Sequence, residues 1–303
     1  MSSWAVCLLN WNGREDTLRC LDALRGLAGE AIVVVADNGS EDGSVAAIRA
    51  AHPEVDLIEN GANLGFSGGY NRAIRRAFEL GASWVVLLNN DAQLVPGALG
   101  ALQAAAARWP AAGVLAGRLL EPDGRIQWAG QRVALLSGYS GRPRGHGRED
   151  APEFRIEGPV ERAVGALMAV SRDAVEAAGE LDEGLFAYVE DVDWSLRIRE
   201  AGFECILVPD AAATHALAAS SGGRLSTGPV YYGVRNTIVV CERHRPLGRA
   251  GTLLRRSSIV GSYLARSLLV VRSRPAVRAV FEGYADARAG RLGPRRASAA
   301  ARS

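Results

Sequence analysis

Acidic side chains and one histidine occur at three points of this chain where they could together handle a metal ion and a proton. The apolar run Trp84–Leu88 ends in Asn89-Asn90-Asp91, the cluster Glu190-Asp191-Val192-Asp193 opens a predicted helix, and His215 follows on a predicted loop. One carboxylate can hold a divalent cation, a second can accept a proton, and a neutral imidazole can complete the ligand shell of the metal. This set of residue types indicates a metal-assisted transferase.

Each of these positions also has a purely structural interpretation. An acidic residue after a buried strand can close a turn, and three carboxylates near a helix start can cap the helix, whose dipole favours negative charge there. A single histidine is more often a hydrogen-bonded polar group than a ligand. Within the acidic cluster we expect Asp191 to face a cleft, and Asp193 to do little beyond capping. The indication of chemistry comes from the joint occurrence of these residues in this order.

Two further segments have the composition of nucleotide-binding loops. Asp37 ends an apolar run, so its carboxylate could bind a nucleoside base or a ribose hydroxyl, or could instead form an Asx turn that caps the next helix. The stretch Asn60–Asn71 places four glycines before a predicted helix, which would let backbone N–H groups approach a diphosphate. It matches neither the dinucleotide fingerprint nor the phosphate loop, and the chain has no lysine with which to form the latter.

Strand-like runs and helical patterns alternate over the first 120 residues, which predicts βαβ units and a parallel sheet covered by helices. The expected strands are Ala5–Leu9, Ala31–Ala36, Val55–Glu59, Trp84–Leu88 and Val114–Leu120. The expected helices are Thr17–Leu27, Ser44–Ala51, Tyr70–Leu80 and Pro96–Arg108. Ligands of such sheets bind beyond the carboxyl ends of the strands, which is where Asn10-Trp11-Asn12, Asp37 and Asn89-Asn90-Asp91 fall.

The pattern is less regular after residue 120. We interpret Gly138–Pro152, which is rich in Gly, Pro and charge, as a mobile surface loop. Beyond it the sequence predicts strands at Arg162–Ser171 and Glu204–Val208, and helices at Arg172–Ala178, Val192–Ala201 and Val230–Glu242. Between Gly251 and Val271 one helical face carries Leu253, Val260, Leu264, Leu268 and Val271, while Arg255, Arg256 and Arg266 lie away from its centre.

The net charge of +2 hides a division of charge along the chain. Residues 1–242 hold 21 Arg against 31 acidic residues, a net charge of −10, and residues 243–303 hold 14 Arg against 2, a net charge of +12. A basic amphipathic helix can lie on an anionic membrane, or it can pack on the acidic body and neutralise it. A nucleic acid is a weaker alternative, because the segment has few aromatic residues to stack on bases and no known reading motif.

The composition is that of a soluble globular protein, with 48% hydrophobic and 22% charged residues. Its four cysteines have no CxxC spacing, so we expect reduced thiols in the core: Cys7, Cys20, Cys205 and Cys241. The N-terminus lacks the basic region and cleavage site of a signal peptide, and no run of about 20 uncharged apolar residues occurs. We therefore expect a cytoplasmic protein, either free or peripheral at the cytoplasmic face of the membrane.

The sequence resembles the inverting glycosyltransferases of family 2, which have the GT-A fold, and especially their rhamnosyltransferase and galactofuranosyltransferase subgroup. The resemblance covers roughly residues 4–243 and rests on seven segments in the right order: CLLNWNG, DNGSEDGS, NGANLGFSGGYNRAI, LLNNDA, EDVDWSLRIREAGF, PDAAATH and YYGVRN. It implies an α/β protein with a GT-A-like, mixed but mostly parallel sheet flanked by helices. It also implies a nucleotide-sugar donor, a divalent cation and a single displacement at the anomeric carbon.

The resemblance assigns roles to the residues that match the motifs of the family. The nucleotide would be contacted by Trp11, Asn12 and Asp37, and the same pocket would be lined by Gly65 and Asn71. Mg²⁺ or Mn²⁺ would be bound by Asp91, which matches the last acid of the DxD motif, and by His215, which matches an additional ligand position. The catalytic base would be Asp191.

The chain departs from the family pattern at the DxD motif, which here reads Asn89-Asn90-Asp91. The first acid is missing, so binding of the ion would depend heavily on the diphosphate of the donor, while Asn89 and Asn90 could still bond to the sugar or ribose. With no lysine available, Arg235 is the candidate for positive charge near the phosphates, with a structural ion pair as the alternative.

These observations together predict three regions: a GT-A glycosyltransferase domain over residues 1–243, a basic amphipathic helical extension over 244–290, and a disordered tail over 291–303. The expected reaction transfers a sugar, first of all a deoxyhexose such as rhamnose, from a dTDP- or UDP-linked donor to a saccharide or polyprenyl-linked saccharide in polysaccharide or cell-wall assembly. Two alternatives stay open. One is a sugar-phosphate nucleotidyltransferase, although the N-terminal loop lacks its basic glycine-rich sequence. The other is a non-catalytic nucleotide-sugar-binding or scaffold protein.

Overall fold

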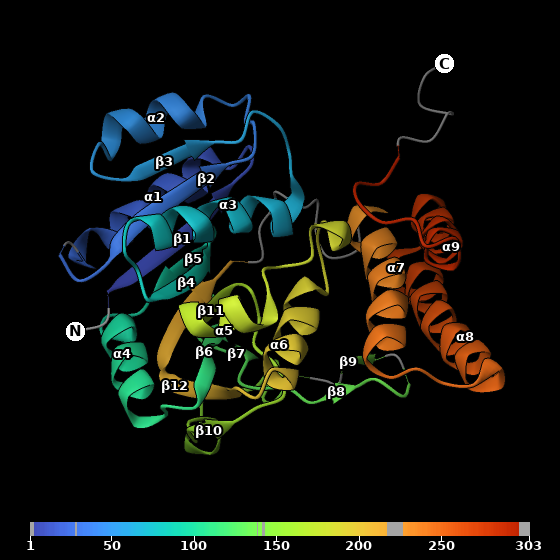
Figure 1. Ribbon diagram of the computed structural model, residues 1–303. Coiled ribbons are helices and arrows are strands. Elements are labelled where there is room, and N and C mark those ends of the chain that lie inside the picture. The colour runs from blue at the N-terminus through green and yellow to red at the C-terminus, as the bar shows by residue number, and fades with distance from the viewer. Residues whose placement is uncertain (1–2, 28, 138, 141–142, 217–226, 297–303) are drawn as a thin grey trace.

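A ten-stranded sheet runs through the larger part of the molecule (Figure 1). The computed structural model describes residues 3–27, 29–137, 139–140, 143–216 and 227–296. The strands of the sheet are β1 (Trp4–Asn10), β2 (Ile32–Asp37), β3 (Asp56–Glu59), β4 (Trp84–Asn89), β5 (Ala92–Leu94), β6 (Ala112–Leu120), β7 (Ile126–Trp128), β10 (Gly158–Pro159), β11 (Leu167–Ser171) and β12 (Glu204–His215). Their order is β10-β12-β6-β11-β4-β1-β2-β3, with β5 paired to β12 and β7 paired to β6.

Strands β1 to β4 form a parallel part of this sheet, as predicted. The predicted strand at Val114–Leu120 is β6, which is separated from β4 by antiparallel β11, and the short strands β5 and β7 are antiparallel to their partners. Strand β1 pairs in parallel with β2 on one side and with β4 on the other. In this register Asn10 lies opposite Asp37, and Leu9 lies opposite Asn89. The carboxyl ends of the three strands therefore meet at one edge of the sheet, which brings the predicted nucleotide-binding and acidic segments together.

The second half of the chain adds antiparallel strands, which the sequence pattern did not distinguish from parallel ones. Strand β11 lies antiparallel between β4 and β6, while β12 runs parallel to β6. The prediction that a strand ends at Val208 and leaves His215 on a loop was wrong. After a register shift between Val208 and Ala212, β12 continues to His215, where it pairs with Ala92 of β5. Pro209 and Asp210 interrupt the apolar pattern and therefore indicate a strand end, although the chain stays in the sheet.

Helices cover the sheet and form a separate layer at the C-terminal side. The α-helices are α1 (Arg14–Leu24), α2 (Ser44–Ala51), α3 (Gly65–Glu79), α4 (Ala98–Arg108), α5 (Arg172–Ala178), α6 (Glu190–Glu200), α7 (Thr227–His244), α8 (Arg249–Arg266) and α9 (Arg274–Arg288). Short 3-10 turns lie at Arg25–Leu27, Pro152–Phe154 and Glu183–Leu185, and a π-helical segment at Ser267–Val271 joins α8 to α9. A two-stranded sheet pairs β8 (Val133–Ala134) with β9 (Tyr139–Ser140).

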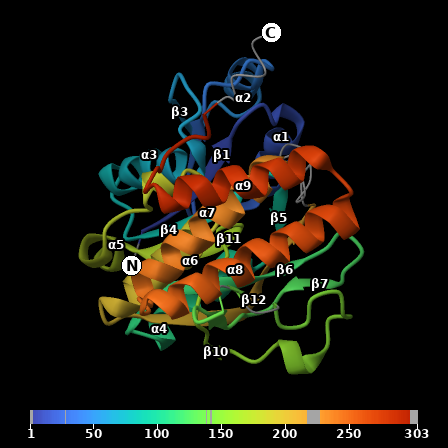
Figure 2. The same ribbon diagram turned by 90° about the vertical axis from the view of Figure 1, so that its right-hand side faces the viewer.

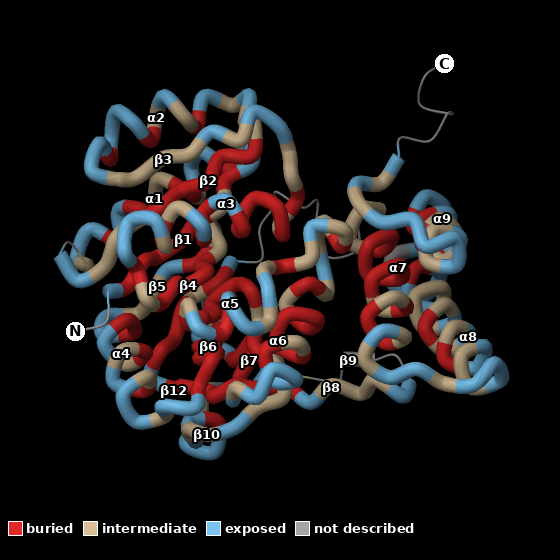
Figure 3. The backbone as a smooth tube through the Cα atoms, viewed as in Figure 1, coloured by how far each residue is buried: buried red, intermediate tan, exposed pale blue. Residues whose placement is uncertain are grey.

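The hydrophobic core is divided between the sheet and the C-terminal helices, as Figure 3 shows in red. The main cluster surrounds β1, β4, β6, β11 and β12, and it includes the fully buried run Val85–Leu88. A second cluster holds α7, α8 and α9 together, with Tyr231, Val234, Ile259 and Val280 among its members. Figures 1 and 2 show these three helices packed side by side next to the body of the molecule. None of the described helices has the length and apolar character needed to span a bilayer.

The face expected between Gly251 and Val271 is only partly a packing face. Val260 and Leu264 pack against the second cluster, whereas Leu253 and Leu268 are exposed, and the side chain of Val271 lies outside the described residues. Arg255, expected away from the centre of this face, is buried and donates to the backbone carbonyls of Leu135 and Arg245.

Two segments expected to be irregular contain defined contacts. Within 138–152, Arg144 N donates to Gly130 O and His146 N donates to Pro143 O, while residues 138 and 141–142 lie outside the described residues. The expected disordered tail, 291–303, begins with an ordered stretch. Gly293 N donates to Gly184 O at 2.6 Å, and Arg295 N donates to the Tyr232 hydroxyl at 2.8 Å. Residues 297–303 of that tail lie outside the described residues.

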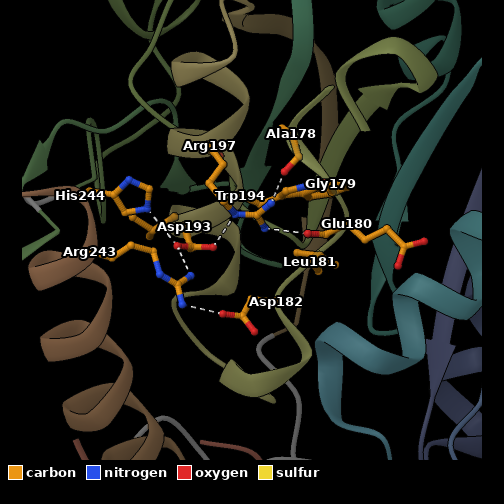
Figure 4. A network of polar contacts seen from close by, with 12 residues as sticks. Ala178, Gly179, Glu180, Leu181, Asp182, Asp193, Trp194, Arg197, Arg243 and His244 are labelled. Atoms are coloured by element: carbon orange, nitrogen blue, oxygen red, sulfur yellow. Dashed lines mark hydrogen bonds and ion pairs between the residues drawn. The ribbon is translucent and has the colours of Figure 1, made fainter. Parts of the chain in front are cut away.

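A buried ion network fixes α6 against α7 (Figure 4). The Asp193 carboxylate is fully buried and accepts hydrogen bonds from Arg197 Nε at 2.8 Å, Arg243 Nη1 at 2.8 Å and His244 Nε2 at 2.9 Å. Arg243 also donates to Asp182 at 2.8 Å, which ties in the segment before α6. Asp193 therefore does much more than cap the helix, in contrast to our expectation.

Candidate active site

A cavity of about 1220 Å³ lies at the edge of the sheet where β1 and β4 end, between that edge, the start of α6, and helices α7 and α8. Asp91, Asp191 and His215 all line it, although they are far apart in the sequence. The structure thus brings the two predicted acids and the predicted imidazole to one cavity. Trp11, Gly65 and Asn90 line it as well, whereas Asn12, Asp37, Asn71 and Arg235 do not belong to its described lining.

Asp37 holds two strand ends together. Its carboxylate accepts a hydrogen bond from Asn10 Nδ2 at 2.7 Å and another from the Ser40 backbone N–H at 2.8 Å, and the residue is 1% exposed. The bond from Ser40, three residues further on, closes the loop after β2, but it does not cap the next helix, because α2 begins at Ser44 and its N-terminal Ser44 N–H donates to Asp42. The next residue, Asn38, lines the cavity instead, and the sequence prediction passed over it.

Asn12 shapes the loop that presents Trp11. It has a left-handed backbone conformation with φ of 51°, which Asn tolerates better than most residues. Its side-chain oxygen accepts from Glu41 N at 2.8 Å, and its own N–H donates to Ser40 Oγ at 2.8 Å. Trp11 is left 47% exposed at the cavity, where an indole ring can stack on a planar ligand.

Gly65 and Asn71, both in α3, position the segment that leads to Asp191. Gly65 has φ of 73°, and a Cβ there would lie 2.4 Å from the carbonyl oxygen of Phe186, so the close approach requires glycine. The expectation that Asn71 lines the pocket was wrong. Its buried amide accepts from Leu181 N at 3.1 Å and donates to Leu181 O at 2.9 Å and to Glu183 at 3.0 Å.

The segment before Asp191 has unusual backbone geometry. Phe186, Tyr188 and Val189 all have positive φ values, of 64°, 67° and 73°, which side chains of these types rarely adopt. Three such residues within four positions indicate backbone strain that the surrounding contacts must hold. Among these contacts, Asn236 Nδ2 donates to three carbonyls of the segment, those of Leu185, Ala187 and Tyr188.

Asp191 is held at the cavity by two donors from the preceding strand connection. Its Oδ2 accepts from Gly165 N at 3.2 Å, and its Oδ1 accepts from Arg162 Nη1 at 3.3 Å. Its side chain is only 15% exposed. A carboxylate oriented in this way, at the rim of a cavity, has the placement that a general base needs.

Glu190 is a second acid at the cavity that the sequence analysis quoted but did not assign. It is buried, it lines the cavity, and its Oε2 has no hydrogen-bond partner in the described part of the chain. Burial raises the pKa of Glu190 to about 8, and the neighbouring Asp191 charge adds to the shift. A neutral carboxyl can donate a hydrogen bond, which an ionised carboxylate cannot.

At the other end of the cavity Asp91 and His215 face each other across the β5–β12 pairing. Asp91 Oδ1 and His215 Nε2 are 3.1 Å apart. The other ring nitrogen, Nδ1, lies 2.6 Å from Gln127 Oε1, while Gln127 Nε2 donates to the carbonyl of His215 at 3.2 Å. Asn89 Nδ2 lies 3.2 Å from Nε2 as well, so the imidazole is held between Gln127 on one side and Asn89 and Asp91 on the other.

Comparisons with known proteins decide the family. The model for glycosyl transferase family 2 matches residues 5–178. An N-acetylglucosaminyl-diphospho-decaprenol L-rhamnosyltransferase from Mycobacterium tuberculosis is 35% identical over 260 residues, which cover 80% of this chain and 83% of that protein. This chain belongs to glycosyl transferase family 2. It is a glycosyltransferase, as the sequence motifs predicted.

Solved structures confirm the GT-A-like fold of this family 2 glycosyltransferase. The mannosyltransferase PcManGT from Pyrobaculum calidifontis, solved with GDP-Man and Mn²⁺, aligns with a TM-score of 0.55 at 17% identity, over 95% of this chain and 86% of that one. TarS residues 1–349 from S. aureus align with a TM-score of 0.57 at 15% identity, over 94% and 80% of the two chains. At these identities the likeness concerns the fold alone.

The residues of this family 2 enzyme fit a divalent cation between Asp91 and His215. Two ligands at right angles around an ion with bonds of about 2.1 Å lie about 3 Å apart, close to the observed separation of Oδ1 and Nε2. The described residues contain no group of three or more acidic, histidine or cysteine side chains that could hold a metal by themselves. A cation here would therefore take its remaining ligands from outside these side chains, from water or from a bound donor.

Arg235 does not supply free charge to the phosphates of a donor. It is fully buried, and its guanidinium donates to Asn236 Oδ1 and to the carbonyls of Gly184, Leu185 and Gly293. Its role is structural, but through backbone carbonyls instead of the ion pair considered from the sequence.

Among the described residues, the arginines that line the cavity of the glycosyltransferase are Arg162, Arg266 and Arg295. No local motif marks them, because three separate segments bring them to the cavity.

Proposed function

We propose that this enzyme transfers a deoxyhexose, first of all L-rhamnose, with inversion, from a nucleoside-diphosphate donor to a polyprenyl-linked saccharide. The 35% identical relative is named for rhamnosyl transfer to a decaprenol-linked N-acetylglucosamine, and 83% of its length is covered. The observation that carries the proposal is that Asp191 lines the same cavity as the Asp91–His215 pair. A base and a leaving-group site in one cavity are what a single displacement requires.

The donor would lie along the edge of the sheet, with its base near Trp11 and its diphosphate near Asp91. Trp11, Asn38 and Asn63 line this end of the cavity, and their ring and amide groups suit a nucleoside. Asp91 and His215 would hold Mg²⁺ or Mn²⁺ there, and the ion would offset the negative charge that gathers on the departing diphosphate. Gln127 would keep the His215 ring in that position.

Asp191 would act as the general base. As the acceptor oxygen forms its bond to the anomeric carbon, the bond from that carbon to the phosphate oxygen breaks, and the hydroxyl proton passes to the Asp191 carboxylate. The Gly165 N–H, the Val192 N–H and the Arg162 guanidinium fix the orientation of this carboxylate at the cavity. The neutral Glu190 beside it can donate to a sugar oxygen without adding charge.

The test is the substitution Asp191→Asn, which keeps the size of the side chain but removes its basicity. We expect turnover to fall by at least about 100-fold, while the Kd for the nucleotide-sugar donor stays within a factor of two or so. Turnover is measured as dTDP or UDP release from the corresponding donors, with a decaprenyl- or shorter-chain diphospho-N-acetylglucosamine acceptor, and donor binding by calorimetry.

Asp173→Asn is the matched control, because Asp173 is an acidic residue in the first turn of α5 and not in the lining of the cavity. It should behave like the wild type. Unchanged turnover in Asp191→Asn would remove Asp191 from the mechanism. Wild-type protein that binds donors but turns over no lipid-linked acceptor would overturn the proposed acceptor.

A further inference from the structure

The segment between α8 and α9 exposes three large apolar side chains in succession. Leu268, Leu269 and Val270 are 57%, 73% and 67% exposed, and we call them the Leu268–Val270 tip. They lie in the π-helical segment, which ends at Arg272 in a left-handed conformation with φ of 50°. Three adjacent apolar side chains directed into solvent form a patch of the kind that marks a membrane or protein contact.

Unpaired positive charge surrounds the tip. Arg266 precedes it, Arg272 and Arg274 follow it, and all three are exposed. None of the three has an ion-pair partner in the described part of the chain, whereas Arg256, Arg278 and Arg295 nearby are each paired with Glu242 or Glu282. An apolar centre with free arginines around it complements a surface of anionic headgroups over acyl chains.

The tip is continuous with the wall of the active-site cavity. Arg266 and Ser267, immediately before it, line the cavity. On this side the wall is aromatic and aliphatic, and it includes Tyr188, Val189, Tyr232, Val240 and Tyr263. The polar end of the cavity, with Asp91 and His215, suits a sugar nucleotide. A sugar nucleotide has no apolar group that would match the other, apolar end. It suits the hydrocarbon next to the diphosphate of a lipid-linked acceptor.

We propose that the Leu268–Val270 tip inserts into the headgroup region of an anionic bilayer, with Arg266, Arg272 and Arg274 on lipid phosphates. The mouth of the cavity then faces the membrane, and the apolar wall receives the lipid chain of the acceptor directly from it. The delivery of the acceptor rests on the proposed function, whereas the binding of the membrane does not. Figure 2 shows α8 and α9 on the side of the molecule that faces the viewer, in front of the sheet.

The first experiment measures co-sedimentation of the full chain with vesicles of three parts phosphatidylcholine to one part phosphatidylglycerol. The triple variant Leu268→Ser, Leu269→Ser, Val270→Ser should reduce the vesicle partition coefficient by at least about tenfold. Ile156→Ser is the control for an exposed apolar residue elsewhere, since Ile156 is similarly exposed but lies two residues before β10, and it should pellet like the wild type. The pair Arg272→Gln, Arg274→Gln should lose the preference for anionic over pure phosphatidylcholine vesicles.

The second experiment compares turnover of a short-chain, water-soluble acceptor with turnover of a polyprenyl acceptor in the same vesicles. The triple variant should keep turnover of the short acceptor and lose most of its turnover of the long one. If no lipid-linked acceptor reacts with the wild type, the proposed function fails. The vesicle experiment still shows whether the Leu268–Val270 tip binds membranes. Equal pelleting of wild type and triple variant would overturn the proposal. So would a wild type that forms dimers through the tip and ignores vesicles, measured by sedimentation velocity.

Discussion

Glu190 and Asp191 are adjacent carboxyl groups at one cavity, but their surroundings differ. Asp191 receives hydrogen bonds from Gly165 and Arg162, whereas Glu190 is buried with Oε2 unpartnered in the described part of the chain. A titratable group in a cavity whose pKa is strongly shifted by burial, as that of Glu190 is, is common at functional sites. The neutral state of Glu190 also has a measurable consequence for stability.

Replacing Glu190 with Gln should change how stability depends on pH. The pKa of Glu190 is raised from an ordinary 4.5 to about 8, so between these values the folded state binds a proton that the unfolded state has lost. Stability of the wild type therefore falls as pH rises through this window. Glu190→Gln removes that loss, and its Tm should exceed that of the wild type by several degrees at pH 8.5 or so, but not at about pH 5. Parallel Tm-against-pH curves for the two proteins would contradict a buried neutral Glu190.

The residues that the sequence placed correctly at the cavity are those whose position follows from strand order. Asp91 comes directly after a buried parallel strand, and such strand ends gather at one edge. Asp37 also follows an apolar strand, yet its carboxylate accepts hydrogen bonds from Asn10 and Ser40 instead of lining the cavity. The bond from Asn10 depends on the register of β1 with β2, which cannot be predicted from the residues around Asp37. Arg162 and Glu190 were missed because their placement depends on packing between distant segments.

At the scale of elements, the ion network between α6 and α7 holds the helix that carries Asp191 in place. Burial would raise the pKa of Asp193, but hydrogen bonds from His244 and Arg197 lower it to about 2. Burial would likewise lower the pKa of His244, but the Asp193 and Glu200 carboxylates raise it above its ordinary 6.5. Asp193 thus contributes stability that is lost as pH falls from about 4 towards 2. His244 contributes stability that is lost as pH rises through its raised pKa.

Asp193→Asn should destabilise the protein strongly. The substitution leaves the Arg243, Arg197 and His244 donors without a buried countercharge, and breaking a buried pair in this way typically costs about 3–5 kcal/mol. Glu200→Gln is the matched control, because Glu200 also contacts His244 but is largely exposed, so its loss should cost less than about 1 kcal/mol. Urea unfolding followed by circular dichroism measures both. A cost for Asp193→Asn as small as that of Glu200→Gln would show that the network contributes little.

The prediction of helices and strands succeeded where the hydrophobic pattern and the capping residues of a segment indicate the same bounds. The predicted bounds of Ser44–Ala51 and Arg172–Ala178 coincide with α2 and α5, the second of which begins after an N-cap in which Ser171 accepts from Ala174 N. The prediction failed for β12, since an interruption at Pro209-Asp210 ends the local signal while pairing with β6 continues. The direction of a strand could not be predicted from its sequence either. Strand β11 has the apolar run of a buried parallel strand but lies antiparallel to β4 and β6.

At the scale of the whole molecule, the last described residues join the C-terminal helices to the active site. Arg235 connects three parts of the chain, because its guanidinium donates both to Gly293 O and to the carbonyls of Gly184 and Leu185. Arg295 pairs with Glu282 and lines the cavity. Sequence composition suggested a disordered tail here, since an Arg- and Ala-rich end has no apolar periodicity. The order comes from long-range bonds to backbone atoms, which composition does not encode.

Removal of residues 291–303 should therefore affect both stability and the site. Without Gly293, Arg235 Nη1 loses its partner in a buried place, which should lower the free energy of unfolding by about 1–3 kcal/mol. The cavity also loses the positive charge of Arg295, so the KM for an anionic, diphosphate-containing substrate should rise. Removal of 297–303 alone is the matched control and should leave both quantities unchanged, because it keeps Gly293 and Arg295. Denaturant unfolding and steady-state kinetics on the two truncated proteins separate these outcomes. If both truncated proteins behave like the full chain, the ordered stretch at 291–296 contributes neither to stability nor to substrate binding. The hydrogen bond from Arg235 to Gly293 would then be dispensable.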